Sequence, residues 1–243
     1  VNSGSEAVDL ALRLAMAGAN LEAYACREHA HWLHDDVLTM DLPSCDAYFV
    51  DPDRRADGKR HVVIAHYQPR LDRLRERLPH HGALGVKVAP GVPHREIDAL
   101  DAEAEFISLD GELKECVLWF GPLRQVRRRA PLLPGRQTLT GEPRLPADIA
   151  RPGAYLYEPD PAIIRAGLVA NLGETIGASL IDPEIAFLTS ERLQPTPFAT
   201  VYRIDESHPF HLKQLAERLR SLRAGRITFV KRGSAVDPEM LIR

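Results

Sequence analysis

The feature that most limits how this chain can fold is a short apolar run that stops at an acidic residue and a proline. Residues 46–50 read D-A-Y-F-V, and Asp51 and Pro52 follow at once. A compact apolar run bounded by turn residues is typical of a strand buried in a parallel sheet. Because such sheets bind ligands at the carboxyl ends of their strands, we expect chemistry at the loop that begins with Asp51.

The residues that follow predict the rest of such a sheet. Leucines spaced along one face predict a helix over residues 67–78. Residues 83–89, A-L-G-V-K-V-A, predict a second buried strand that ends at Pro90. Residues 104–108 and 115–120 flank an Asp-Gly turn, which is a strong signal for an antiparallel hairpin. We therefore expect an α/β fold whose parallel sheet ends in a hairpin.

The second half of the chain predicts a smaller α+β module. Residues 153–169 join a strand to a helix whose start is marked by Asp160 as cap and Pro161 in the first turn. Three further apolar runs predict strands, at residues 185–190, 196–204 and 225–233. Between the last two, residues 212–222 predict an amphipathic helix.

A basic segment rich in Pro and Gly, residues 124–149, separates these halves. This composition predicts a connector that pairs a strand or two with the module that follows it. We therefore expect three parts: residues 1–123, the connector 124–149, and a second module at residues 150–243.

Charge is distributed unevenly between the halves. Residues 1–123 carry 13 Lys and Arg against 21 Asp and Glu, and residues 124–243 carry 18 against 13, within a total net charge of −3. A basic half suits a polyanionic partner, and Arg127, Arg128 and Arg129 could follow a phosphate backbone. A surface whose charge merely varies explains the same counts.

Composition and cysteine content exclude several classes of protein. Hydrophobic residues make up 44% and charged residues 27% of the chain, as in folded globular proteins. No run approaches the ~20 apolar residues of a membrane span, and the N-terminus lacks a signal-peptide core, so we expect a cytoplasmic protein. The three cysteines include no C-x-x-C pair, which favours reduced thiols over disulfides or a zinc ribbon.

The spacing of two further motifs argues against a metal site and a nicotinamide site. Cys26, His29, His31 and His34 lie close together in the sequence, but His29 and His31 are two residues apart and diverge on a helix. We therefore expect no metal at this cluster. Nicotinamide-binding Rossmann enzymes need a G-x-G-x-x-G run after a first strand, and the sequence contains none.

Three phrases in the first half resemble one protein family. They are Y-F-V-D-P-D-R-R at 48–55, L-G-V-K-V-A-P-G at 84–91 and E-F-I-S-L-D-G-E-L-K-E-C-V-L-W-F-G at 105–121. They look like the class I S-adenosylmethionine-dependent methyltransferases of a bacterial group that ends in a THUMP-like domain. Y-L-Y-E-P-D-P at 155–161 and V-K-R-G-S-A-V-D-P-E at 230–239 resemble that domain. The resemblance implies a partial Rossmann-like sheet followed by a smaller α+β THUMP-like domain.

The resemblance also implies S-adenosylmethionine as the cofactor, with Asp36 near its adenine amino group and Asp35 as the competing residue. Enzymes of this class begin with a strand and a glycine-rich loop that approaches the cofactor, and no such pattern precedes Asp36. Residues 1–20 resemble the helix that follows the ribose-binding strand. We therefore expect either a fragment, which we favour, or a protein that has lost its methyl-donor site.

Four residues of the loop after Val50 are candidates for the reaction itself. Methyl transfer from a sulfonium mainly requires an acceptor lone pair held in line with the S–CH₃ bond. Asp51 could accept a hydrogen bond from the acceptor and border the cofactor, while Pro52 fixes the backbone beside it. Arg54 and Arg55 offer forked cations to a phosphate or a base. In the alternative interpretation Asp51 only caps the loop and both arginines are solvated.

THUMP domains recruit RNA, so the resemblance implies an RNA methyltransferase that acts on tRNA or rRNA. This step is an analogy at the level of the fold. The alternative is a non-catalytic RNA-binding protein that retains a degenerate methyltransferase fold.

Overall fold

The structure, a computed structural model, describes residues 33, 35–56, 59–78, 83–144 and 148–230. The chain divides into two compact units, Val1–Pro43 and Ser44–Arg243. The smaller unit is described only at Leu33 and at residues 35–43, and all the sheets below belong to the larger one.

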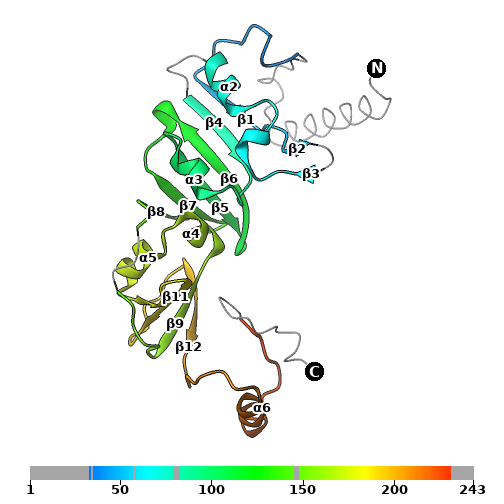
Figure 1. The fold of residues 1–243 in the computed structure, drawn as a ribbon. Helices are drawn as coiled ribbons and strands as arrows, with labels where there is room; N and C mark the ends of the chain where they lie inside the picture. The colour runs from blue at the N-terminus through cyan, green and yellow to red at the C-terminus, as the bar shows by residue number, and fades with distance from the viewer. Residues whose placement is uncertain (1–32, 34, 57–58, 79–82, 145–147, 231–243) are drawn as a thin grey trace. The chain divides into compact units, whose positions relative to one another are not determined.

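A six-stranded mixed sheet forms the first half of the larger unit (Figure 1). Its strands are β1 (Ala47–Val50), β4 (Ala83–Val88), β5 (Glu103–Leu109), β6 (Glu112–Phe120), β7 (Arg128–Leu133) and β8 (Gln137–Gly141). The spatial order is β1-β4-β6-β5-β7-β8. Strands β1 and β4 are parallel, and β6 lies antiparallel between β4 and β5. The expected parallel strands followed by an antiparallel hairpin are therefore confirmed.

Helices cover one face of this sheet. They are α2 (Leu71–Arg77), α3 (His94–Asp98) and, from the second half of the chain, α4 (Pro161–Ala166). Arg75 of α2 lies 5.0 Å from the ring of Phe120, and α4 contacts β5, β6 and β7. Because side chains alternate along a strand, every second residue faces these helices. The buried apolar residues on this face include Val86, Val88, Ala104, Phe106, Cys116 and Leu118.

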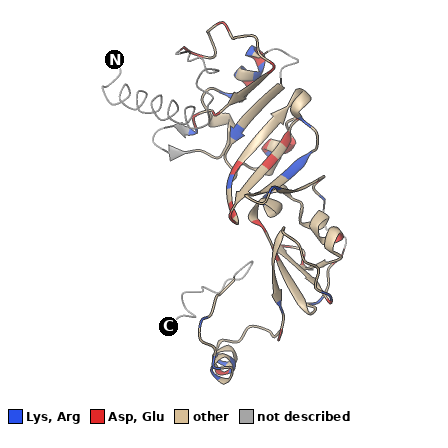
Figure 2. Ribbon diagram, turned by 180° about the vertical axis from the view of Figure 1, so that it is seen from behind, with Lys and Arg blue, Asp and Glu red and all other residues tan. Residues whose placement is uncertain are grey.

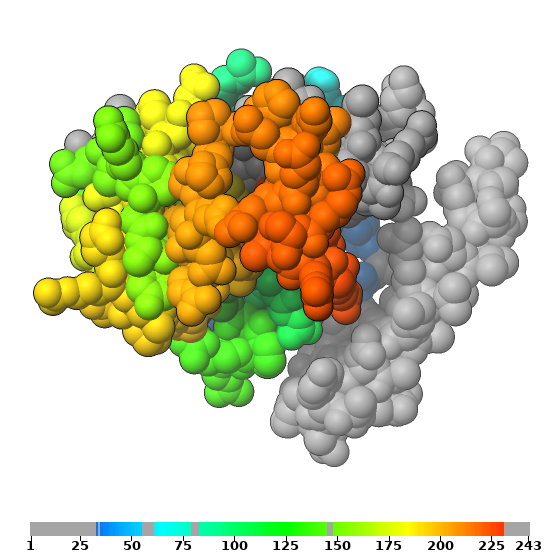
Figure 3. Space-filling model, turned by 90° about the horizontal axis from the view of Figure 1, so that it is seen from below, coloured from blue at the N-terminus to red at the C-terminus, as the bar shows by residue number. Residues whose placement is uncertain are grey.

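The second module contains an antiparallel sheet of order β10-β11-β9-β12. Its elements are β9 (Tyr155–Pro159), α5 (Val169–Ile176), β10 (Ser179–Asp182), β11 (Ile185–Ser190), β12 (Ala199–Arg203) and α6 (Leu212–Ser221). Charged positions are interspersed over the six-stranded sheet but sparse in these strands (Figure 2). Helix α6 has no buried residue, and it lies at the surface of the larger unit in the view of Figure 3. The expected α+β module is confirmed, including the cap at Asp160, whose carboxylate accepts from the Ala162 amide at 2.8 Å.

Three sequence expectations differ from the structure. The helix expected from residue 67 begins at Leu71, because Gln68 is drawn into an isolated β-bridge with Asp53. Residues 225–230, expected as part of a strand, are not a strand. The connector was expected to pair a strand or two with the module after it, but its strands belong to the first sheet, because β7 is parallel to β5 and β8 pairs with β7. Its last residue, Ile149, does meet that module, in an isolated parallel β-bridge with Leu180 of β10. The expected connector is thus largely part of the first sheet.

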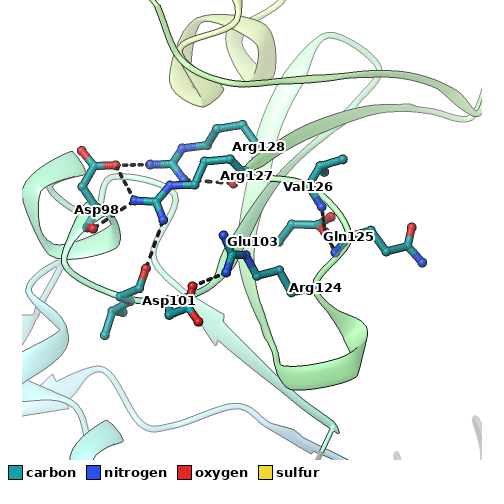
Figure 4. A network of polar contacts seen from close by, with 9 residues as sticks. Asp98, Asp101, Glu103, Arg124, Gln125, Val126, Arg127 and Arg128 are labelled. Atoms are coloured by element: carbon teal, nitrogen blue, oxygen red, sulfur yellow. Dashed lines mark hydrogen bonds and ion pairs between the residues drawn. The ribbon is translucent and has the colours of Figure 1, made fainter.

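The arginines of this segment are held by acidic groups of the first half (Figure 4). Arg128 is only 1% exposed and is paired with Asp98, and its neighbour Arg127 donates to the carbonyl oxygens of Asp98 and Leu100 at 3.0 and 3.4 Å. A buried guanidinium has no surface to offer an RNA phosphate, so the expectation for Arg128 is corrected. Arg129 keeps a quarter of its side chain exposed and is paired with Glu103.

Glu103 is the acidic centre of this segment and is 1% exposed. Its carboxylate accepts from the backbone amides of Gln125 and Val126, at 2.8 and 3.0 Å, and from Arg129. Burial alone would raise the pKa of Glu103, but Arg129 and the two amides outweigh burial and lower it. These contacts fix the turn that leads into β7.

We predict that Glu103→Gln lowers the free energy of unfolding by about 2–4 kcal/mol, because a donor replaces one acceptor of a buried network. Because the pKa of Glu103 is lowered in the folded state, its contribution is complete above the unfolded pKa of about 4.3 and is lost as the pH falls through the folded value. The difference in unfolding free energy between wild type and variant, measured by urea unfolding, should therefore decrease as the pH is lowered.

Glu112→Gln, at an exposed residue paired with Lys114, is the control and should change stability by less than about 0.5 kcal/mol.

Candidate functional site

Asp51 lies at the carboxyl end of β1, where the sequence predicted chemistry. Its carboxylate, about half exposed, accepts from the ammonium group of Lys87 at 3.2 Å, and Lys87 also lies 3.4 Å from Glu115. Burial alone would lower the pKa of Lys87, but Asp51 and Glu115 outweigh burial and raise it above its usual value. Three neighbouring strands thus contribute a cluster of two carboxylates around one ammonium group, which we call the edge cluster.

Beside the edge cluster, the sheet face opposite the helices carries two aromatic rings. Phe49 and Trp119 lie with ring centroids 6.0 Å apart on either side of Gly85. A Cβ at Gly85 would come within 2.6 Å of the Trp119 ring and 2.8 Å of Phe49, so only glycine leaves room for both. The Trp119 indole donates to Glu105 at 2.7 Å, which fixes the ring. Phe49 is 58% exposed, so this face offers an aromatic surface.

The loop after Asp51 is tied to the loop after β4. Pro52 is buried, and Asp53 exchanges two backbone hydrogen bonds with Gln68, at 2.7 and 2.9 Å. Tyr67, the residue just before Gln68, is 1% exposed, and its hydroxyl accepts from the Ala89 amide at 2.9 Å. Burial is the main reason that the pKa of Tyr67 is raised. Two loops that meet at the carboxyl edge are therefore held by one buried hydroxyl group.

A second contact ties the segment after Asp51 to helix α3. Glu96 of α3 accepts from the backbone amide of Ile64 at 2.8 Å. Ile64 begins the short 3-10 helix η2 (Ile64–His66), which lies in the segment between β1 and α2. The segment after Asp51 is thus held both to the loop after β4 and to α3.

The remaining predicted residues are placed as follows. Arg54 is half-buried, and its carbonyl oxygen accepts from the His61 amide at 2.7 Å. Arg55 begins the short hairpin of β2 (Arg55–Ala56) and β3 (Lys59–Arg60), and its side chain lies outside the described structure. The roles of these arginines stay predictions.

Asp36 belongs to the smaller unit, whereas Asp51 belongs to the larger one. Its carboxylate accepts from the Leu38 amide at 2.9 Å, and its own amide donates to Asp35 at 2.8 Å. Both acidic side chains therefore stabilise a turn, and the expected contact of Asp36 with the cofactor stays a prediction.

The expected absence of a metal site concerns residues that the structure does not describe. Cys26, His29, His31 and His34 all lie outside the described part of the chain. Among the described residues, no group of three or more His, Cys, Asp or Glu could hold a metal ion. Within the same residues, no helix is long and apolar enough to cross a membrane.

Sequence reasoning missed Lys87, Glu115 and Tyr67 as parts of the site. One signal in the sequence could have identified Lys87. It is the only charged residue in residues 83–89, an apolar run that predicts a buried strand. A lysine there needs a partner, since a buried unpaired charge is costly. Nothing in the sequence marks Tyr67, whose role depends on a hydrogen bond to a residue 22 positions away.

Comparison with known proteins finds relatives of this chain. Two proteins from Mycobacterium tuberculosis, of the strains CDC 1551 / Oshkosh and H37Rv, are each 34% identical to this chain over 241 residues. Both are named uncharacterized S-adenosylmethionine-dependent methyltransferase. The match covers 96% of this chain, which spans 64% of the length of these relatives.

A solved structure shows the same fold. It is described as a "putative methyltransferase" from Porphyromonas gingivalis W83 and superposes with a TM-score of 0.57 at 20% identity. The superposition covers 72% of this chain and 47% of that one. Residues 199–243, which include β12 and α6, match the family model THUMP domain-like. The chain is therefore a homologue of proteins named S-adenosylmethionine-dependent methyltransferases, with a THUMP-like segment at its C-terminal end.

Proposed function

We propose that the protein is an S-adenosylmethionine-dependent methyltransferase that acts on RNA in the cytoplasm, with tRNA or rRNA as the substrate class. The observation that carries the proposal is Asp51, an exposed carboxylate at the carboxyl end of a parallel strand, where doubly wound sheets bind their ligands. The names of the mycobacterial relatives support the methyl donor. The THUMP-like segment supports RNA as the partner by analogy.

The edge cluster fits a cationic donor. S-adenosylmethionine supplies an electrophilic methyl group on a positively charged sulfur with a neutral leaving group, so the protein needs to position more than to protonate. Two carboxylates and one ammonium give the edge cluster a net negative charge, which tolerates a sulfonium nearby. Asp36 is the proposed contact to the adenine.

The chain's own residues would orient the methyl acceptor. The Asp51 carboxylate accepts a hydrogen bond from the N–H or O–H of the acceptor and so directs its lone pair towards the donor. Lys87 holds that carboxylate in place from the neighbouring strand. Buried Pro52 fixes the backbone direction just after it. Arg54 and Arg55 are proposed to bind the phosphate or base of the RNA, and the partly exposed Arg127 and Arg129 are retained as weaker candidates.

We predict that Asp51→Ala in the full-length protein lowers kcat for methyl transfer to bulk tRNA or rRNA by at least about 100-fold. The side chain is exposed and its loss leaves the fold intact, so the melting temperature should stay within about 2 °C. Transfer is measured with radiolabelled S-adenosylmethionine. Asp72→Ala, at an exposed residue of α2 paired with Arg70, is the control and should keep full activity.

Calorimetric titration of the same protein with S-adenosylmethionine separates the proposal from its alternative. Heat of binding with transfer supports the enzyme. A folded protein that binds RNA but gives no heat with the donor would instead identify a non-catalytic RNA-binding protein. Full activity of Asp51→Ala would remove Asp51 from the proposed mechanism.

RNA binding should depend on salt and on exposed arginines of the THUMP-like segment. Arg220 of α6 is exposed, and a phosphate contact by it would release one counterion. We predict that Arg220→Gln reduces the slope of log affinity against log salt by about 1, measured by fluorescence anisotropy with labelled tRNA. Arg73→Gln, at an exposed arginine of α2, should leave the slope unchanged. An unchanged slope in Arg220→Gln would place the RNA elsewhere.

A further inference from the structure

Helix α4 belongs to the second module in sequence but completes the core of the first sheet. Its residues Ala162, Ile163 and Ala166 are fully buried, and it contacts β5, β6 and β7. Its capping residue Asp160 also accepts from Ser108 of β5 at 2.9 Å, and Ser108 is 0% exposed. The helix is therefore fixed to the sheet at its first turn.

One side chain of α4 reaches the loop that follows β4. Arg165 donates from Nε to the carbonyl oxygen of Pro90 at 2.9 Å and from a terminal nitrogen to that of Val92 at 2.6 Å. Its other terminal nitrogen lies 2.7 Å from His94, and its guanidinium lies 5.5 Å from the ring centroid of Phe106. All three nitrogens of one guanidinium are thus directed at a single loop and the first residue of α3.

That loop borders the edge cluster. Val88 ends β4, and Ala89 begins the loop two residues after Lys87. The Ala89 amide is held by Tyr67, and the Val92 amide donates back to Ala89 at 3.0 Å. Lys87 in turn binds Asp51. A shift of the loop would therefore reach Asp51 through the end of β4.

We propose that Arg165 is a positioning residue by which the second module sets the conformation of the loop 89–93 beside Asp51. The consequence for methyl transfer rests on the function proposed above, but the structural coupling does not. A guanidinium suits this role because its planar fork offers fixed donors in several directions, whereas a lysine offers a point charge. A role in charge alone, such as binding an RNA phosphate, would be retained by lysine.

The test is hydrogen–deuterium exchange of the full-length protein carrying Arg165→Met or Arg165→Lys. We expect the amides of Ala89 and Val92 to exchange at least about 10-fold faster in both variants, because the loop loses its carbonyl contacts while β4 and β6 keep theirs. Arg73→Met is the matched control and should leave this loop unchanged. If Arg165→Met fails to fold, Arg165→Lys decides the outcome alone. Unchanged loop exchange in a folded variant, or full restoration by lysine, would overturn the proposal.

Enzyme kinetics give a second test, because a residue that only stabilises the fold would not change kcat. With saturating RNA we expect kcat to fall by about 10- to 100-fold in both variants, since a displacement of about 1 Å near the reacting groups costs that much. The KM for S-adenosylmethionine and the affinity for RNA should stay at wild-type values. Weaker RNA binding with unchanged kcat and unchanged loop exchange would identify Arg165 as an RNA contact and overturn the proposal.

If the proposed function is wrong, the two experiments give a different combination of results from the one expected if the role of Arg165 is wrong. A wild-type protein that transfers no methyl group to RNA would remove the catalytic consequence. Faster loop exchange in both Arg165 variants would still support the coupling between α4 and the loop.

Discussion

Burial of one face of the six-stranded sheet is the constraint on which the rest of the larger unit depends. Most side chains on that face are apolar and almost inaccessible, and a fully buried Val, Leu or Phe there contributes about 1.5–3 kcal/mol. The helices that cover it come from both halves of the chain, because α4 lies beyond the segment expected to be a connector. Once α4 is placed, Asp160 and Arg165 reach the carboxyl edge of the sheet. Packing therefore brings the second module to the edge at which Asp51 lies.

The chemistry of that edge is governed by charges shared between strands. Lys87 lies between two carboxylates from neighbouring strands, and this partnership explains how a lysine is tolerated in an otherwise apolar strand. The same pattern recurs at Glu103, a buried acid whose partners include Arg129 and two backbone amides. In both places an ionised side chain joins strands that are distant in sequence. Arg128 and Arg129, which belong to the basic second half, are thus paired with acidic residues of the first half, and less of their charge is available to an RNA than the composition suggests.

Local signals in the sequence were enough to predict much of this architecture. The apolar run before Asp51, the Asp-Gly hairpin and the Asp160 cap each depend on neighbouring residues, and all three are found in the structure. The pairing of β7 with β5 could not be predicted in this way, because it depends on acids some 25 to 30 residues upstream that neutralise the arginines. The residues of the site also divide into those that a local motif marks and those that only distant contacts define. Asp51 is marked by its own motif, whereas Tyr67 and Arg165 act through contacts 22 and 75 positions away.

The origin of α4 also bears on the order in which the protein can fold during synthesis. Strands β1 to β7 leave the ribosome before α4, yet part of their apolar face has no cover until α4 is made. The nascent sheet is therefore exposed to water, and to other chains, until residues 161–166 have also emerged. Proteins that shield nascent hydrophobic surfaces would have their main opportunity in that interval.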